Sequence, residues 1–173
     1  MVTKIFLKNE RHISHFCVTI SSMNYTVCFI GHRLIPVMIV WDKLKIAIEK
    51  EILNGCNHFI VGSHGDFDKY ALRLCREFKK KYAYLTIDLV VTSLSKIYSI
   101  NESGEHYFDD INVISYNIEE IYFKKIIEES NKQMIDNSDK IICYINKDKV
   151  QSGARKALNY AIKQNLQIVN LFY

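Results

Sequence analysis

The sequence predicts an α/β domain of Rossmann type, in which a mostly parallel sheet carries helices on both faces. Two observations lead to this expectation. Short runs of β-branched and aromatic residues alternate along the chain with longer segments of helical periodicity. Two of the short runs end directly in glycine, as a buried strand does where it turns toward a helix. Strands that alternate with helices pair in parallel and place their connections on the faces of the sheet.

The first strand and the first helix are predicted within residues 25–55. Residues 25–30 form a run of mainly β-branched and aromatic side chains that ends at Gly31, which is typical of a buried strand. A helix is expected over residues 40–53, because apolar side chains recur there at four-residue spacing and Gly55 follows as a stop. The side chains expected on its inner face are Leu44, Ile48 and Ile52.

A second unit of strand, helix and strand is predicted from residue 58 to residue 91. The strand over residues 58–61 ends at Gly62. Asp66 or Asp68 can cap a helix that runs to about residue 82, because acidic side chains accept hydrogen bonds from the first turn of a helix. The third strand is expected over residues 85–91.

The second half of the chain predicts the remaining elements. A polar loop that can fold over a site is expected over residues 93–110. A helix is expected over residues 118–135, since most of its apolar residues fall on one helical face. The other predicted elements are strands over 113–115, 140–145 and 167–171 and a helix over 153–164.

The composition is that of a cytoplasmic globular domain. The chain has 173 residues, 49% of them hydrophobic and 24% charged, with a net charge of +4. So small an excess of cations is not typical of a nucleic-acid-binding surface. The five cysteines are widely spaced, so neither a disulfide framework nor a metal site is expected. No membrane span or signal peptide is expected, because no apolar run has the necessary length.

Residues 1–22 do not continue the pattern of strands and helices. We expect them to form a loosely packed amino-terminal extension, while residues 23–173 form one domain. In open α/β sheets, ligands bind outside the carboxyl ends of the strands. The segments that follow predicted strands are therefore the place to look for functional residues.

The turn after the second predicted strand is the first candidate. Its two glycines allow a ligand to approach the backbone, and the free N–H groups at the start of the following helix favour an anion. The candidates in this turn are Gly62, Ser63, His64, Gly65, Asp66 and Asp68. The alternative is a tight turn that binds nothing. The spacing matches neither a Walker A loop nor the G-x-G-x-x-G motif.

Further candidates lie in three other segments. Gly31, His32 and Arg33 follow the first strand. Ser152 and Gly153 open the last helix, and Asn131 lies inside the helix expected over 118–135. An arginine at a strand end can bind a phosphate through two parallel hydrogen bonds, and a histidine offers a titratable donor. For each of these residues a purely structural role is the alternative.

Four motifs occur in a fixed order over about residues 25–171. They are Cys28-Phe-Ile-Gly-His-Arg33, Val61-Gly-Ser-His-Gly-Asp-Phe-Asp68, Met134-Ile-Asp-Asn-Ser-Asp139, and Ser152-Gly-Ala-Arg-Lys-Ala-Leu-Asn-Tyr-Ala161, which leads to Ile168-Val-Asn-Leu171. As a set they resemble the SLOG superfamily, and within it the YpsA-like branch of bacterial proteins. The resemblance implies a nucleotide-binding domain over residues 23–173. Its ligand would be a nucleotide, a nucleotide-sugar or an NAD-derived molecule.

The resemblance leaves three functions open, since a fold does not by itself define an activity. The first is a ligand sensor or binder, and another is a DNA-associated module like the DprA-type relatives. The third is a phosphoribohydrolase, whose glycine loop reads Gly-Gly-x-Gly-Thr-x-x-Glu. At the threonine and glutamate positions this chain has Asp66 and Lys69, and Ser130 replaces the arginine before Asn131. A hydrolase would therefore depend on Asp68 or Asp66 as its acid/base.

The same expectations define the partners. A nucleotide-like small molecule is expected, whereas no further cofactor, metal, membrane or nucleic acid is expected. SLOG relatives often pair through helices beside the site, which leaves a homodimer open. The apolar residues of the helix over 118–135 can pack against a second copy of the chain or against the core of the same chain.

Overall fold

The computed structural model describes residues 25–92, 109–113, 123–149 and 152–173. The expected amino-terminal extension and most of the expected polar loop lie outside these ranges. The described elements are β1 (Thr26–Gly31), α1 (Val37–Leu53), β2 (His58–Val61), α2 (Asp66–Lys81), β3 (Thr86–Val91), β4 (Asp110–Val113), α4 (Phe123–Asp136), β5 (Lys140–Tyr144), α5 (Gly153–Lys163) and β6 (Gln167–Asn170).

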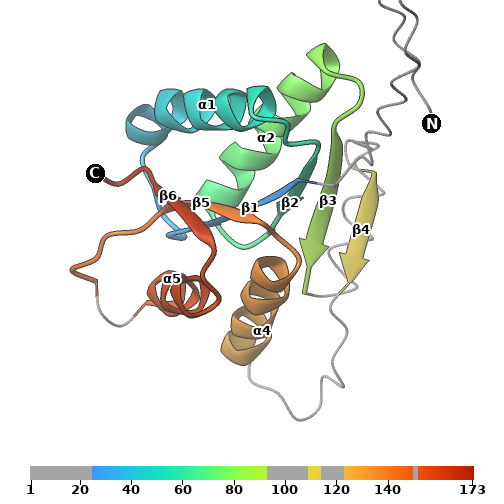
Figure 1. Cartoon of the computed structure of the whole chain (residues 1–173). Helices are drawn as coiled ribbons and strands as arrows, with labels where there is room; N and C mark the ends of the chain where they lie inside the picture. The colour runs from blue at the N-terminus through green and yellow to red at the C-terminus, as the bar shows by residue number, and fades with distance from the viewer. Residues whose placement is uncertain (1–24, 93–108, 114–122, 150–151) are drawn as a thin grey trace, which may run out of the picture.

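These strands form one sheet in the order β4-β3-β2-β1-β5-β6, and every neighbouring pair is parallel. The chain runs outward from β1 to β4, and then returns to β5 on the other side of β1. Figure 1 shows α1 and α2 on one face of the sheet and α4 and α5 on the other. The predicted Rossmann-like α/β fold is therefore confirmed.

Two layers of buried side chains hold the helices on the sheet. Because successive side chains of a strand point to opposite faces, β1 contributes Val27 and Phe29 to the layer under α1 and α2. It contributes Cys28 and Ile30 to the layer under α4 and α5. The expected inner face of α1, formed by Leu44, Ile48 and Ile52, is buried in the first layer.

Some boundaries differ from the expected ones. Helix α1 begins at Val37 rather than near residue 40, directly after Pro36. The backbone of Pro36 is extended, with φ −62° and ψ 122°, so the proline stands just outside the helix, where its missing N–H costs nothing. Strand β4 lies at Asp110–Val113, three residues before its expected start. None of the described helices has the length and apolar character that a membrane span needs.

A close contact fixes α2 above the carboxyl end of β1. A Cβ atom added to Gly31 would lie 2.5 Å from the Cβ atom of Phe67, in the first turn of α2. The side chain of Phe67 is fully buried and stacks on Tyr144 of β5, with 6.4 Å between the ring centroids. Gly31 is therefore needed because the first turn of α2 comes so near the strand.

At the opposite edge of the sheet, where the strands begin, a buried charged group connects α1 to the sheet. The Glu51 carboxylate, on α1, accepts hydrogen bonds from the Lys140 ammonium at 2.8 Å and from the Tyr25 hydroxyl at 2.7 Å. Burial raises the pKa of Glu51, but the hydrogen bonds and the charge of Lys140 outweigh this effect and lower the pKa below its ordinary value. Glu51 is therefore a buried carboxylate that depends on its partners.

Replacing Gly31 with alanine should lower the free energy of unfolding by about 1–3 kcal/mol, because the new methyl group would overlap Phe67. The matched control is Gly153→Ala, where an added Cβ has no atom within 4 Å. That variant should stay within about 0.5 kcal/mol of the original chain. Urea unfolding followed by circular dichroism measures both. Equal losses of stability in the two variants would contradict the role given to the contact between Gly31 and Phe67.

Replacing Lys140 with methionine should cost roughly 3 kcal/mol of stability, since Glu51 would remain buried without its cation. The double variant Lys140→Met, Glu51→Leu removes both charges and should recover most of that loss. Thermal and urea unfolding at pH 7 compare the two. If the single variant is as stable as the original chain, the ion pair does not hold this edge.

Candidate functional site

The strand order reverses at β1, and this defines the position where a ligand is expected. Strands β1 and β5 are neighbours in the sheet, but the chain between them passes through β2, β3 and β4. Ligands of open α/β sheets bind outside the carboxyl ends of the strands at such a switch point. Because all described strands are parallel, the turns that begin at Gly31, Gly62 and Asn146 leave the same edge of the sheet.

His32 joins the carboxyl ends of β1 and β5. Its backbone N–H donates to the carbonyl of Tyr144 at 3.3 Å, and its ring Nε2 accepts the backbone N–H of Asn146 at 3.0 Å. Because Nε2 acts as the acceptor, the ring is neutral and its proton sits on Nδ1. Burial lowers the pKa of His32, and the positive charge of Lys149 lowers it further. The fold therefore holds a neutral imidazole with an Nδ1–H donor at the switch point.

The turn after β1 and the turn after β2 pack against one another. The backbone N–H of Asp66 donates to the Arg33 carbonyl at 2.9 Å. The Asp66 carboxylate accepts the N–H of Ile35 at 3.4 Å. A Cβ added to Gly65 would lie 2.9 Å from the Cα of Arg33. Gly65 is thus required by a second close approach of two backbones, and the two turns form one unit while the Arg33 side chain stays exposed.

The glycine turn after β2 binds a carboxylate from its own chain. Asp68 Oδ2 accepts the backbone N–H of His64 at 2.7 Å, and a Cβ at Gly62 would lie 2.8 Å from the same oxygen. The His64 ring is fixed by a 2.7 Å hydrogen bond between Nε2 and the hydroxyl of Thr92. Half-buried Ser63 lies in the same turn. The carboxylate of Asp68 therefore accepts a hydrogen bond from an amide that was expected to donate to the ligand.

The expected helix cap at this turn was wrong. Helix α2 begins at Asp66, and its N-cap is Gly65, which has no side chain to accept a hydrogen bond. Asp66 and Asp68 are the first and third residues of the helix, where their charges still favour the positive end of the helix dipole. Neither carboxylate is simply a cap. Asp68 reaches back to the turn, and Asp66 reaches across to the turn after β1.

Ser152 and Gly153 lie at the amino end of α5. The hydroxyl of Ser152 accepts the N–H of Arg155 at 3.1 Å, so Ser152 is a conventional N-cap. Gly153 is exposed, and an added Cβ would meet no neighbour within 4 Å. No close approach of the backbone therefore demands a glycine there. These two residues share the sheet edge with His32, but their contacts are explained by the start of the helix.

Asn131 is set apart from the other candidates. It is half-buried on the half of α4 that leads toward the amino end of β5. None of the hydrogen bonds in the described part of the chain joins it to the turns at residues 31–35 or 62–68. The structure thus brings the candidates after β1 and β2 together, places those of α5 on the same edge, and leaves Asn131 in the helix layer.

Two residues at this edge were missed by the sequence analysis. Thr92 fixes His64, and Asn146 donates to His32 through its backbone. These contacts join residues 28 and 114 positions apart in the sequence. The only available signal was that both residues follow the end of a predicted strand. Within the described ranges, no group of three histidine, cysteine, aspartate or glutamate side chains is arranged to hold a metal ion.

Lowering the pH should weaken the fold through His32. In the unfolded chain its imidazole gains a proton as the pH falls below about 6.5, whereas the folded protein resists protonation because Nε2 accepts a hydrogen bond. The His32 contribution to stability is therefore complete above that pH and is lost as the pH falls toward the lower pKa of the folded state. Urea unfolding between pH 7.5 and 5 measures the loss, which can reach about 1.4 kcal/mol per pH unit.

The control is His32→Gln, whose amide oxygen can accept the Asn146 N–H but does not titrate in this range. Its stability should change less than that of the original chain over the same interval. Parallel curves for the two proteins would mean that His32 is not the titrating group. The resonance of the His32 ring in an NMR titration gives an independent measure of the same pKa.

No family model matches the chain, and no curated protein is significantly similar to it. The resemblance to the SLOG superfamily therefore depends on the four ordered motifs, and membership in that superfamily stays a prediction. What the geometry provides is a Rossmann-like sheet whose turns after β1 and β2 are joined by hydrogen bonds, with a neutral histidine between β1 and β5.

Proposed function

We propose that this chain is a binding domain for a small nucleotide-like molecule with a phosphate group. The single observation that carries the proposal is the setting of His32. Its Nε2 is engaged by Asn146, so its Nδ1–H is the ring donor that remains for a ligand. It lies at the switch point of the sheet, where Rossmann-like domains bind their ligands. As in the sequence analysis, the expected ligand is a nucleotide, a nucleotide-sugar or an NAD-derived molecule.

The charges near His32 support an anionic ligand. Arg33 follows it directly and is exposed, and the turn after β5 carries exposed Lys147 and Lys149. Lys149 is near enough for its positive charge to lower the pKa of His32. The amino end of α5 adds the positive end of a helix dipole on the same sheet edge. An arginine and a lysine can then bind the phosphate, while the imidazole donates to an acceptor.

The hydrogen bonds at the glycine turn favour binding over cleavage. A catalytic acid/base must exchange a proton with the substrate. Asp68 Oδ2 instead accepts a backbone N–H and lies against Gly62, and Asp66 accepts the N–H of Ile35 while its other oxygen is 3.4 Å from the Lys69 ammonium. These carboxylates have structural partners, so we place the phosphate nearer His32 and Arg33 than the turn at Gly62.

Thermal unfolding tests the proposal with inorganic phosphate, AMP, NAD and UDP-glucose as probes. A molecule held at a hundred times its Kd should raise Tm by roughly 5–10 °C in a domain of this size. Arg33→Ala should reduce the shift, because the exposed guanidinium is expected to bind the phosphate. The matched control is Lys45→Ala, which removes an exposed cation from α1. No shift with any probe, or equal shifts in both variants, would contradict the proposal.

A second measurement separates binding from hydrolysis. The chain is incubated with nucleoside monophosphates and with NAD, and released base is followed by chromatography. We expect no release. Base release that is lost in Asp68→Asn would overturn the assignment as a binder, since this substitution keeps an oxygen for the His64 N–H but removes the acid/base.

A further inference from the structure

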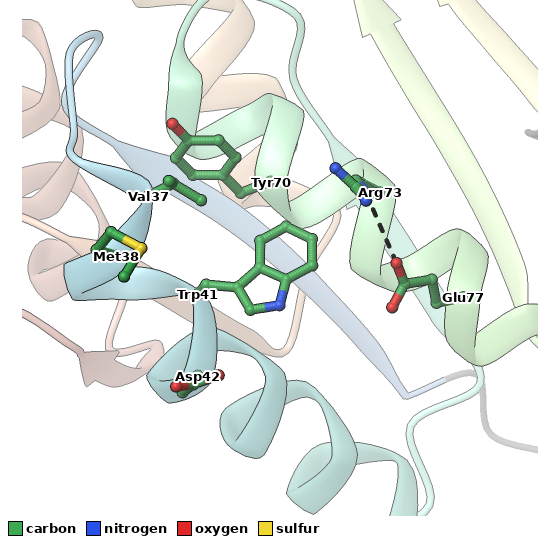
Figure 2. Close-up of a pocket in the computed structure, with 7 residues that line it drawn as sticks. All are labelled: Val37, Met38, Trp41, Asp42, Tyr70, Arg73 and Glu77. Atoms are coloured by element: carbon green, nitrogen blue, oxygen red, sulfur yellow. Dashed lines mark ion pairs between the residues drawn. The ribbon is translucent and has the colours of Figure 1, made fainter.

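A groove of about 520 Å³ lies between α1 and α2, away from the residues discussed above (Figure 2). Its aromatic part is formed by Trp41 of α1 and Tyr70 of α2, whose rings meet edge to face with 6.2 Å between their centroids. The Tyr70 hydroxyl donates to the Ile35 carbonyl at 3.2 Å, which fixes this ring. The volume of the groove is within the range of small-molecule sites.

A guanidinium group of the chain already occupies the face of the indole. The Arg73 guanidinium carbon lies 5.1 Å from the centre of the Trp41 ring, and Nε lies 3.6 Å from a carboxylate oxygen of Glu77. Figure 2 shows Arg73 and Glu77 beside Trp41. The Arg73 side chain is 72% exposed, and so exposed an ion pair contributes little to stability. Displacing Arg73 from the ring therefore costs the fold little.

The rest of the lining suits a cation with an apolar stem. Asp42 adds a second carboxylate, and within the described residues it has no ion pair. The groove lining thus contains two carboxylates and one cation, and the cation pairs with Glu77. Val37 and Met38 form the apolar wall, and Met38 is 90% exposed. A ring face, two carboxylates and an apolar wall together match a guanidinium group on an alkyl chain.

We propose that the groove between α1 and α2 binds a guanidinium group carried on an apolar stem, and that Arg73 takes its place in the ligand-free molecule. The incoming guanidinium stacks on Trp41 in place of Arg73 and pairs with Glu77. Asp42 adds a second negative charge to the lining, and the stem of the ligand covers Val37 and Met38. Arg73 moves outward into solvent. The group can belong to a free small molecule or to an arginine of a peptide, since both present the same chemistry.

Trp41 is the only tryptophan of the chain, so its fluorescence reports on the groove directly. The full chain is titrated with butylguanidinium chloride at constant ionic strength. We expect a saturable change in emission. Butylurea, which has the same shape without the charge, should produce no saturable change. Equal responses to the two compounds, or a response that never saturates, would overturn the proposal.

Variants test whether Arg73 competes with the ligand for the groove. Arg73→Ala should tighten butylguanidinium binding by about threefold or more, because the ligand no longer competes with Arg73. The double variant Asp42→Asn, Glu77→Gln should weaken it by about threefold or more. Lys80→Ala is the matched control, as it removes an exposed cation of α2 outside the groove. Weaker binding in Arg73→Ala, or the same change in Lys80→Ala, would contradict the assignment.

Two short peptides distinguish the sources of the guanidinium. One has a central arginine between apolar residues, and the other has lysine at that position. Binding of the arginine peptide more tightly than butylguanidinium, with the lysine peptide weaker, assigns the groove to a peptide partner. Equal affinity of the arginine peptide and butylguanidinium assigns it to a small molecule. A lysine peptide that binds as tightly as the arginine peptide would overturn the specificity for guanidinium.

Discussion

The contact between Gly31 and Phe67 sets the geometry of the whole carboxyl edge of the sheet. Because the strand has no Cβ at this point, the first turn of α2 can lie directly on β1. The turns after β1 and β2 then come close enough for Asp66 and Arg33 to share a backbone hydrogen bond. His32, next to Gly31, is thereby held where it can reach the backbone of Asn146. A bulkier residue at position 31 would separate these groups.

This arrangement explains why the chemistry of the edge differs from the expected phosphate turn. A helix amino end with glycines favours an anion, and here Asp68 supplies one from the same chain by accepting the His64 amide. One amide of the turn therefore has its partner without a ligand. The exposed cations lie at the switch point itself, with Arg33 in the turn after β1 and Lys147 and Lys149 in the turn after β5. We therefore propose a ligand centred on His32 rather than on the glycine turn.

The groove between α1 and α2 shares a structural support with the sheet edge. The Tyr70 hydroxyl bonds to the carbonyl of Ile35, in the turn that also carries His32 and Arg33. One turn thus supports the aromatic ring of the groove and also carries polar residues of the edge. Their charges nevertheless differ, since the groove lining contains the carboxylates of Asp42 and Glu77, whereas the edge carries the cations Arg33 and Lys149 near His32.

The sequence alone determined the order of strands and helices, the parallel sheet and the edge on which the candidate residues lie. Those features follow from local hydrophobic periodicity and from glycines at strand ends. It placed Asn131 inside a helix, but it could not reveal that Asp68 accepts the His64 amide of the glycine turn. Nor could it show that His32 reaches Asn146, which lies 114 residues away. Only the tertiary structure decided these points, because hydrogen bonds between distant turns leave no periodic pattern in the sequence.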